Sequence, residues 1–278
     1  MIALTEKAIA LLRSKASSTG VYLTVPFFYC REVARECGFS VRETEILALE
    51  NGICPSRYER SAGTFGLSGQ ARLLSSKAAV IGCGGLGGWI IEILARAGVG
   101  EIVMADGDVF DDNNLNRQLY SRESSIGASK ALAAAERVRE INSAVEAFPF
   151  EGYLNRGNAA ELLRGCSVVI DALDSNKARR DVFAACRELD IPFVHGAIGG
   201  FFGQVSVFYP SDTPFWYSED VPDKGAETET GNPPFTPPFV ASLESCEALK
   251  ILAGLDSVLL KKLLWFDLEN QDMQKIKF

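Results

Sequence analysis

The sequence predicts an α/β fold in which a doubly wound, mostly parallel sheet carries helices on both faces. From residue 78 onward, short apolar segments alternate with segments of helical periodicity, which indicates strands joined by helices. A glycine-rich turn at 82–87 connects the first of these strands to its helix, as in Rossmann-like sheets. The 278 residues, 47% hydrophobic and 23% charged, are enough for one such domain with a small appendage.

Residues 1–55 are expected to form a small helical N-terminal appendage, and residues 56–278 the main domain. Ser40 can cap one of the appendage helices, because Glu43 stands three residues on and completes a capping box. Two helices have the spacing of a helix-turn-helix, but the acidic chain favours a packing or dimerisation element over DNA binding. Apolar periodicity predicts helices at 3–16, 32–37 and 41–50.

The main domain is expected to alternate strands with helices and then to end in antiparallel strands. The strand at 204–209 is expected to be antiparallel, and the proline-rich segment 210–238 is long enough to be functional or mobile. Strands are predicted at 78–81, 102–105, 145–150, 167–172, 192–195, 204–209 and 263–267, followed by a short final strand. Helices are predicted at 86–97, 128–141, 158–163, 177–189 and 239–253.

Charge, apolar runs and cysteine spacing exclude several classes of protein. The net charge of −8 argues against nonspecific binding of nucleic acid through a basic face. No apolar run is long enough to span a bilayer and the N-terminus lacks a signal-peptide core, so we expect no membrane partner and a cytoplasmic location. The seven cysteines form no C-x-x-C pair, so reduced thiols are expected and zinc is not. The single histidine, His195, is expected to be a buried core residue.

The glycine-rich turn is the first candidate site, because it lets backbone N–H groups approach a phosphate at the start of a helix. Asp106 ends the next strand, where a ribose hydroxyl would be bound. Alone, this pattern suggests a nicotinamide or flavin cofactor. The basic and amide-rich loop at 113–118 has no evident use in hydride transfer and suits a triphosphate instead. The glycines of the turn are Gly82, Gly84, Gly85 and Gly87.

In combination, these segments resemble the ThiF/MoeB/HesA adenylyltransferases, which are related to the ubiquitin-activating enzymes. The resemblance runs from Arg57 to the C-terminus. It implies that the protein binds ATP and Mg²⁺ and transfers AMP to a carboxylate with release of pyrophosphate. The usual carboxylate is the C-terminal glycine of a ThiS/MoaD-like, ubiquitin-like sulfur carrier protein. The segments that carry the resemblance are 57–60, 82–87, 98–100, 106–109, 114–118, 126–130, 171–174 and 196–204.

The resemblance implies that two cations contact the phosphates. Arg117 can bind a phosphate bidentately, and Lys130 supplies a compact point charge. Asp174, with Ser175 beside it, resembles the family's magnesium-linked aspartate, and one carboxylate suffices because Mg²⁺ also binds phosphate oxygens. Asp108 is expected to organise the loop rather than to touch ATP.

Further roles follow from the same resemblance. Asp106 holds the ribose, and Asn114 and Gln118 donate amide hydrogen bonds beside the phosphates. Arg60 resembles an arginine that reaches into the neighbouring subunit's site, so the expected active unit is a homodimer. Taken singly, each residue has a plainer explanation, such as a solvated surface charge or, for Asp174, a helix cap. Together, five polar residues in family register make coincidence improbable.

The chain departs from the resemblance in its cysteines. It lacks the two C-x-x-C pairs that hold a structural zinc in many relatives. Glu227 stands where many relatives carry a cysteine, four residues before Gly231. Cys246 lies in a predicted helix, where a small packed residue is the expected role, and Cys83 need not face the substrate. A thioester or persulfide relay is therefore not expected, and the reaction is expected to stop at the acyl-adenylate.

Three other functions are weighed against this one. The acceptor can instead be a peptide, a tRNA-borne carboxylate or a small molecule; the acidic chain disfavours tRNA, while the extra residues 1–55 suit a peptide-docking module. A nicotinamide-dependent oxidoreductase would explain the glycines and Asp106 but not the 113–118 loop. An inactive partner that has kept the fold would be free to lose Arg117, Lys130 or Asp174, and all three are present.

Overall fold

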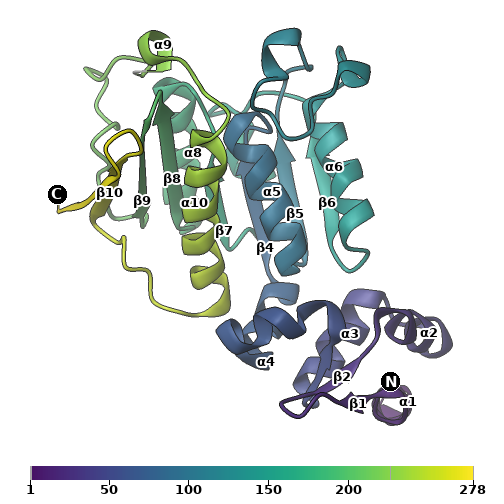
Figure 1. Ribbon diagram of the computed structural model, residues 1–278. Coiled ribbons are helices and arrows are strands. Elements are labelled where there is room, and N and C mark those ends of the chain that lie inside the picture. The colour runs from purple at the N-terminus through teal and green to yellow at the C-terminus, as the bar shows by residue number, and fades with distance from the viewer. Residues whose placement is uncertain (1, 226, 278) are drawn as a thin grey trace.

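The computed structural model describes residues 2–225 and 227–277, and an eight-stranded sheet is its centre (Figure 1). The strands follow the order β11-β10-β9-β8-β7-β4-β5-β6. They are β4 (Lys77–Ile81), β5 (Glu101–Ala105), β6 (Glu146–Phe150), β7 (Val168–Asp171), β8 (Phe193–Gly199), β9 (Phe202–Phe208), β10 (Lys262–Asp267) and β11 (Asp272–Lys277).

The sheet is parallel from β6 to β8 and antiparallel from β8 to β11, which confirms the predicted mixture. The strand order reverses at β4, because β5 pairs with one of its edges and β7 with the other. In a doubly wound sheet, this reversal leaves a crevice at the carboxyl ends of the strands, where ligands bind.

Helices cover both faces of the sheet (Figure 1). Along β4, Ala78 and Val80 belong to the core under α5 and α10, whereas Ala79 and Ile81 belong to the core under α7 and α8. Because helices cover both faces of the sheet, successive residues of this strand are all apolar. The helices of the main domain are α4 (Glu59–Ser75), α5 (Gly85–Ala97), α6 (Lys130–Ile141), α7 (Ala159–Leu162), α8 (Asn176–Leu189), α9 (Glu227–Thr230) and α10 (Thr236–Ala253).

The N-terminal unit differs from the expected purely helical appendage, because a small three-stranded sheet joins its helices. The strands are only two or three residues long, too short for a period of two to show in the sequence. The capping box at Ser40 is present, with Glu43 bonded back to the Ser40 backbone N–H. The elements are α1 (Ile2–Lys15), β1 (Ser17–Ser18), β2 (Leu23–Val25), α2 (Phe27–Cys37), α3 (Val41–Glu50) and β3 (Ile53–Pro55).

Two helices differ from the sequence prediction. Helix α2 starts at Phe27, five residues earlier than expected, directly after Pro26. Helix α4 was not predicted, because Gly66 interrupts it with a non-helical conformation and weakens its periodicity. Figure 1 shows α4 between the N-terminal unit and the amino end of the sheet. No helix in the described ranges has the length and apolar character that crossing a membrane requires.

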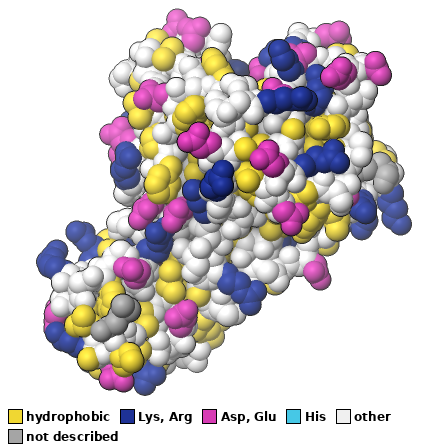
Figure 2. Space-filling view, turned by 180° about the vertical axis from the view of Figure 1, so that it is seen from behind, with side chains coloured by type: hydrophobic (Ala, Val, Ile, Leu, Met, Phe, Trp, Pro, Cys, Tyr) yellow, Lys and Arg dark blue, Asp and Glu magenta, His cyan; other side chains and the backbone are white. Residues whose placement is uncertain are grey.

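Charged side chains of both signs are mixed on the face opposite to that of Figure 1. Figure 2 shows Lys and Arg interspersed with Asp and Glu there, without a broad basic surface. The same view shows the N-terminal unit as a smaller lobe beneath the main domain.

Candidate active site

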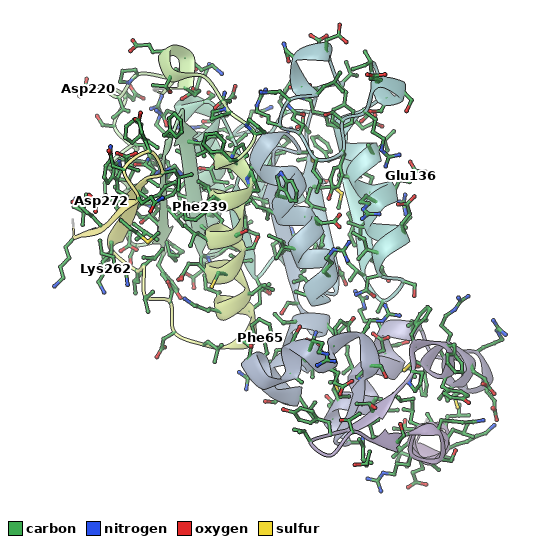
Figure 3. The ribbon with its side chains drawn as sticks, viewed as in Figure 1. Phe65, Glu136, Asp220, Phe239, Lys262 and Asp272 are labelled. Carbon is green, nitrogen blue, oxygen red and sulfur yellow. The ribbon has the colours of Figure 1, made fainter. Side chains whose placement is uncertain are left out.

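A cavity of about 360 Å³ opens at the carboxyl ends of β7 and β8, beside the point where the strand order reverses. Its walls come from segments far apart in the sequence: the glycine-rich turn, the 113–118 loop and the segment 210–238. Figure 3 shows this end of the molecule, where Asp220 marks the 210–238 segment. The lining residues include Gly85, Arg117, Asp174, His195, Gln204 and Trp265.

The glycine-rich turn is packed so closely that two of its positions accept no side chain. Gly82 has a φ of 102°, and a Cβ there would lie 2.5 Å from the carbonyl oxygen of Ala172. A Cβ on Gly87 would lie 1.8 Å from the carbonyl oxygen of Gly82. Gly84 and Gly85 form the N-cap and first residue of α5, so the turn presents the start of a helix to the cavity.

Asp106 connects this turn to the end of β5. Its two carboxylate oxygens accept hydrogen bonds from the backbone N–H groups of Cys83 at 2.7 Å and Asp108 at 2.8 Å. Burial raises the pKa of Asp106 above its ordinary value, and these two bonds offset the rise only partly. The carboxylate therefore holds two loops in register at the position predicted for the ribose.

The loop that carries Arg117 lies against the glycine-rich turn. The aliphatic part of Arg117 is 3.7 Å from the Cβ position of Gly85, and the Gln118 amide is 3.5 Å from that of Gly84. Partial burial lowers the pKa of Arg117. Asn114, by contrast, is buried and its Oδ1 accepts from the backbone N–H of Asp111, so it shapes the loop instead of facing the cavity.

Lys130 begins helix α6 and is only 6% exposed. Its ammonium lies 2.9 Å from the carboxylate of Asp108, whose other oxygen accepts a short hydrogen bond from the Tyr153 hydroxyl. Partial burial would raise the pKa of Asp108, but Tyr153 and Lys130 lower it below its ordinary value. The structure thus gives Asp108 the loop-organising position that the sequence suggested.

Asp174 follows strand β7 and has a side chain that is 78% exposed at the cavity. It does not cap the next helix, so the plainer explanation of Asp174 as a cap is wrong. Ser175 is the N-cap of α8: its hydroxyl accepts from the backbone N–H of Ala178 at 3.2 Å and donates to Asp223 at 2.8 Å. Asp174 is therefore left for another partner, which here is the ammonium of Lys224, 2.7 Å away.

The donor set around Asp174 fits a magnesium ion that is shared with phosphate oxygens. Mg²⁺ binds proteins through one or two carboxylates and keeps its other positions for water and phosphate. Asp174 is such a carboxylate, exposed in the same cavity as Arg117. Within residues 2–225 and 227–277, no group of three or more His, Cys, Asp or Glu side chains is arranged to hold a metal ion. That no zinc binds stays a prediction.

Arg60 is not brought together with these residues. It is exposed in the first turn of α4, at the amino end of the sheet, whereas the cavity lies at the carboxyl end (Figure 1). Only a second subunit could bring an Arg60 to this cavity.

A buried polar cluster that the sequence did not identify forms the floor of the cavity. Asp171, fully buried at the end of β7, pairs with Arg179 and lies 2.7 Å from Nδ1 of His195. Arg179 also donates to the Leu173 carbonyl at 2.7 Å, so it holds the turn that carries Asp174. Burial lowers the pKa of His195, which keeps the ring neutral. An aspartate in an otherwise apolar strand was the available signal, since a buried charge requires a partner.

His195 itself is 1% exposed, as predicted, yet its ring also reaches the cavity wall, where Nε2 lies 3.3 Å from Nε2 of Gln204.

The segment 210–238 forms the outer wall of the cavity. Trp216 is 2% exposed and packs against Phe183 and His195, with ring centroids 5.7 and 5.4 Å apart. The carbonyl of Asn232 accepts from the Asn116 amide at 3.0 Å, which ties this segment to the Arg117 loop. The long segment is therefore built around an aromatic anchor and closes over the site.

The cysteines lie apart from this chemistry. Cys83 is in the glycine-rich turn but 1% exposed, and burial raises the pKa of its thiol well above the ordinary value. All seven thiols are unpaired, and Cys246 is the exposed one among them. A buried neutral thiol is a poor nucleophile.

We compared the chain with protein families and with curated proteins. The ThiF family model matches residues 58–278. The SAMP-activating enzyme E1 of Haloferax volcanii is 36% identical over 218 residues, which are 77% of this chain and 80% of that protein. The adenylyltransferase and sulfurtransferase MOCS3-1 of Zea mays is 32% identical over 77% of this chain, and the chain spans only 47% of its length.

Among solved structures, the chain is similar to E. coli tRNA N6-threonylcarbamoyladenosine dehydratase, TcdA, in complex with ATP. The identity is 32%, the TM-score 0.52, and the match covers 54% of this chain and 65% of that one. The family match begins at Tyr58, so the N-terminal unit lies outside it. Because the family model covers most of its length, the chain belongs to the ThiF family.

Proposed function

We propose that the protein is an ATP-dependent adenylyltransferase that activates the C-terminal glycine of a ThiS/MoaD-like, ubiquitin-like sulfur carrier protein. The observation that carries the proposal is the meeting of three groups at the carboxyl ends of the strands. The start of α5 at Gly85, together with Arg117 and Asp174, lines one cavity. This is the set of groups that a nucleoside triphosphate and its metal ion require.

The reaction joins two anions, so charge neutralisation is its main requirement. A carboxylate oxygen of the acceptor attacks the α-phosphorus of ATP, the bond from the α-phosphorus to the bridging oxygen breaks, and pyrophosphate leaves. Arg117 binds phosphate oxygens through its planar guanidinium, and Lys130 exchanges its ion pair with Asp108 for one with phosphate. Both cationic side chains then stabilise the negative charge that develops in the transition state.

The remaining residues position the nucleotide. Asp106 accepts the ribose hydroxyls and Gln118 donates an amide hydrogen bond beside the phosphates. Asp174, with Ser175 beside it, would hold Mg²⁺. The ion, when bound, supplies further positive charge for the phosphate oxygens. We include Asn114 in this site because it stabilises the shape of the 113–118 loop.

The acceptor site is the deeper part of the cavity. Its wall on β8 and β9 includes three small residues, Ala197, Gly199 and Gly203, among larger ones such as Ile198 and Phe202. The ring of Phe202 stacks on that of Trp265 at a centroid distance of 5.9 Å beside this wall. A flexible glycine-ended tail fits such a slot, and its carboxylate would arrive next to Asp174 and Arg117.

The active unit is proposed to be a homodimer, in which Arg60 of each subunit completes the site of the other. The reaction is proposed to end at the acyl-adenylate, because the thiol near the nucleotide, Cys83, is buried and neutral. The unpaired thiols are in keeping with a cytoplasmic location.

ATP–pyrophosphate exchange with Mg²⁺ and a panel of carriers that end in Gly-Gly tests this proposal. Exchange that depends on one carrier is expected. Asp174→Ala should abolish it, because the metal loses its protein carboxylate, whereas Cys246→Ala should leave it within about twofold, since no covalent step uses this thiol. Loss of exchange in a folded Cys246→Ala variant would contradict the absence of a relay. Failure with every carrier, with ATP still bound, would exclude the carrier as substrate.

One observation favours a second acceptor class. The N-terminal unit has a core of its own, built on residues such as Leu12, Val25 and Val33, and lies outside the family match. A separate compact unit of this kind suits the docking of a peptide whose carboxylate is then adenylated. Exchange supported by a peptide, and lost when residues 1–55 are removed, would decide for this class.

A further inference from the structure

Lys224 is a charged residue of the cavity mouth that neither the family resemblance nor the proposed mechanism uses. It lies in the segment 210–238, between Asp223 and Gly225, both of which line the cavity. Its ammonium is 2.7 Å from Oδ2 of Asp174, which is the carboxylate proposed to hold Mg²⁺.

The backbone before Lys224 is fixed on the first turn of α8. The carboxylate of Asp223 accepts from the Ser175 hydroxyl at 2.8 Å and from the Lys177 backbone N–H at 2.7 Å. The Asp223 carbonyl accepts from the backbone N–H of Asn176 at 2.8 Å, and the Asn176 amide donates to the Pro222 carbonyl at 2.7 Å. Four hydrogen bonds therefore determine where the Lys224 side chain starts.

Stability does not account for this arrangement. The side chains of Lys224 and Asp174 are 49% and 78% exposed, and an ion pair so open to water contributes little to stability. Each side chain of such a weak ion pair can easily change to a partner that it binds more strongly. Lys224 is also close enough to Asp108 to lower its pKa, after the larger effects of burial, Tyr153 and Lys130. Lys224 and Lys130 thus both act on the carboxylate of Asp108.

We propose that Lys224 is a further nucleotide-binding residue, which exchanges Asp174 for the triphosphate of ATP when Mg²⁺ takes its place on that carboxylate. A Lys ammonium and a divalent ion cannot share one carboxylate closely, because like charges repel. The released ammonium stays at the cavity mouth, since Asp223 holds the backbone, and the phosphates are its nearest new anions. This inference rests on the proposed function and adds a cation that comes from the segment covering the acceptor.

Equilibrium binding of nucleotides without any acceptor tests the proposal, because no turnover occurs. Lys224→Met keeps the length of the side chain and removes its charge. We expect this variant to bind ATP in the presence of Mg²⁺ about tenfold more weakly than the unchanged protein, because one charge-assisted contact with the phosphates is lost. AMP, which lacks the β- and γ-phosphates, should bind within about twofold.

Two controls separate the charge of Lys224 from its surroundings. Lys224→Arg should restore most of the ATP affinity. Lys261→Met removes another exposed cation, whose ammonium lies 3.7 Å from the buried carboxylate of Asp212, and should leave ATP binding unchanged. Equal ATP affinity of Lys224→Met and the unchanged protein would overturn this inference while the proposed function stands. If the unchanged protein bound no ATP in the presence of Mg²⁺, both would be overturned.

Discussion

The amino and carboxyl ends of the sheet contain the same kinds of residue, but their surroundings differ. At the amino end, a Cβ on Gly98 would lie 2.7 Å from the Tyr58 ring, and one on Gly100 would lie 1.8 Å from the Leu74 carbonyl oxygen. At the carboxyl end, Gly82 and Gly87 are equally crowded. The difference lies in what surrounds them: protein covers the first pair, and a cavity adjoins the second.

One acidic residue from each end, Glu45 and Asp174, shows the same difference in surroundings. At the amino end, Glu45 is fully buried, accepts from the Tyr58 hydroxyl at 3.1 Å and pairs with Arg57 at 3.3 Å. At the carboxyl end, Asp174 has its ion pair in the open and Lys130 is paired with an exposed carboxylate. Glycines and charges at a sheet end therefore indicate a ligand only where the charges remain accessible.

The largest expected effect compares one arginine from each end. Arg117→Ala should lower pyrophosphate exchange by a factor of about 10³, because a preorganised cation at the phosphates is lost, with little change in Tm. Arg42, which donates to the Gly100 carbonyl at 2.8 Å and pairs with Glu101, is the matched residue. Arg42→Ala should lower Tm by a few degrees and leave exchange unchanged. Pyrophosphate exchange and thermal unfolding, measured on both variants, test this difference between the two ends, and the reversed pattern would contradict it.

A pair of glycine substitutions sharpens the comparison. Gly87→Ala and Gly100→Ala each place a Cβ 1.8 Å from a carbonyl oxygen, so each should reduce the free energy of unfolding by about 3 kcal/mol or more. Only Gly87→Ala should also lower the ATP affinity of the molecules that remain folded, because it displaces the turn at the phosphates. Nucleotide titration at 10 °C alongside urea unfolding separates the two losses. Equal ATP affinity in both variants would place the phosphates elsewhere.

The smallest expected effect is a pH dependence of stability at the amino end of the sheet. Burial raises the pKa of Glu45 from 4.5 to about 7, more than Arg57 and Tyr58 lower it. The folded state then binds a proton more tightly than the unfolded state, so this contribution to stability is complete below pH 4.5 and is lost as pH rises to about 7. Glu45→Gln should therefore be more stable than the unchanged protein at pH 8, by up to about 3 kcal/mol, and similar at pH 4. Urea unfolding at both pH values tests this; a gain at pH 4 alone would refute it.

The sequence was most informative where local chemistry is repetitive. The alternation of apolar strands with helices, the turn at Gly82–Gly87 and the capping box at Ser40 each depend on a few neighbouring residues. The antiparallel strands β9 to β11 also agree with the prediction. The small sheet at β1 to β3 was missed because its strands carry no period.

The site was predictable only in part. Arg117, Lys130 and Asp174 were predicted through motifs, but the side chains that contact them were not. The bond of Lys224 to Asp174 joins residues 50 positions apart. The cluster of Asp171, Arg179 and His195 forms only when β7, α8 and β8 pack together. Such contacts depend on the tertiary structure, for which a single sequence carries no local signal.

The hydrogen bond from the Asn116 amide to the Asn232 carbonyl has a kinetic consequence. It joins the loop that would bind the nucleotide to the segment that would enclose the acceptor. A ligand that orders one of the two lowers the entropic penalty of ordering the other, and by thermodynamic linkage the help is mutual. Substrate addition should thus show synergy, with the Michaelis constant for either substrate falling as the other approaches saturation. Severing this single amide contact would convert a coupled pair of substrates into two independent ones.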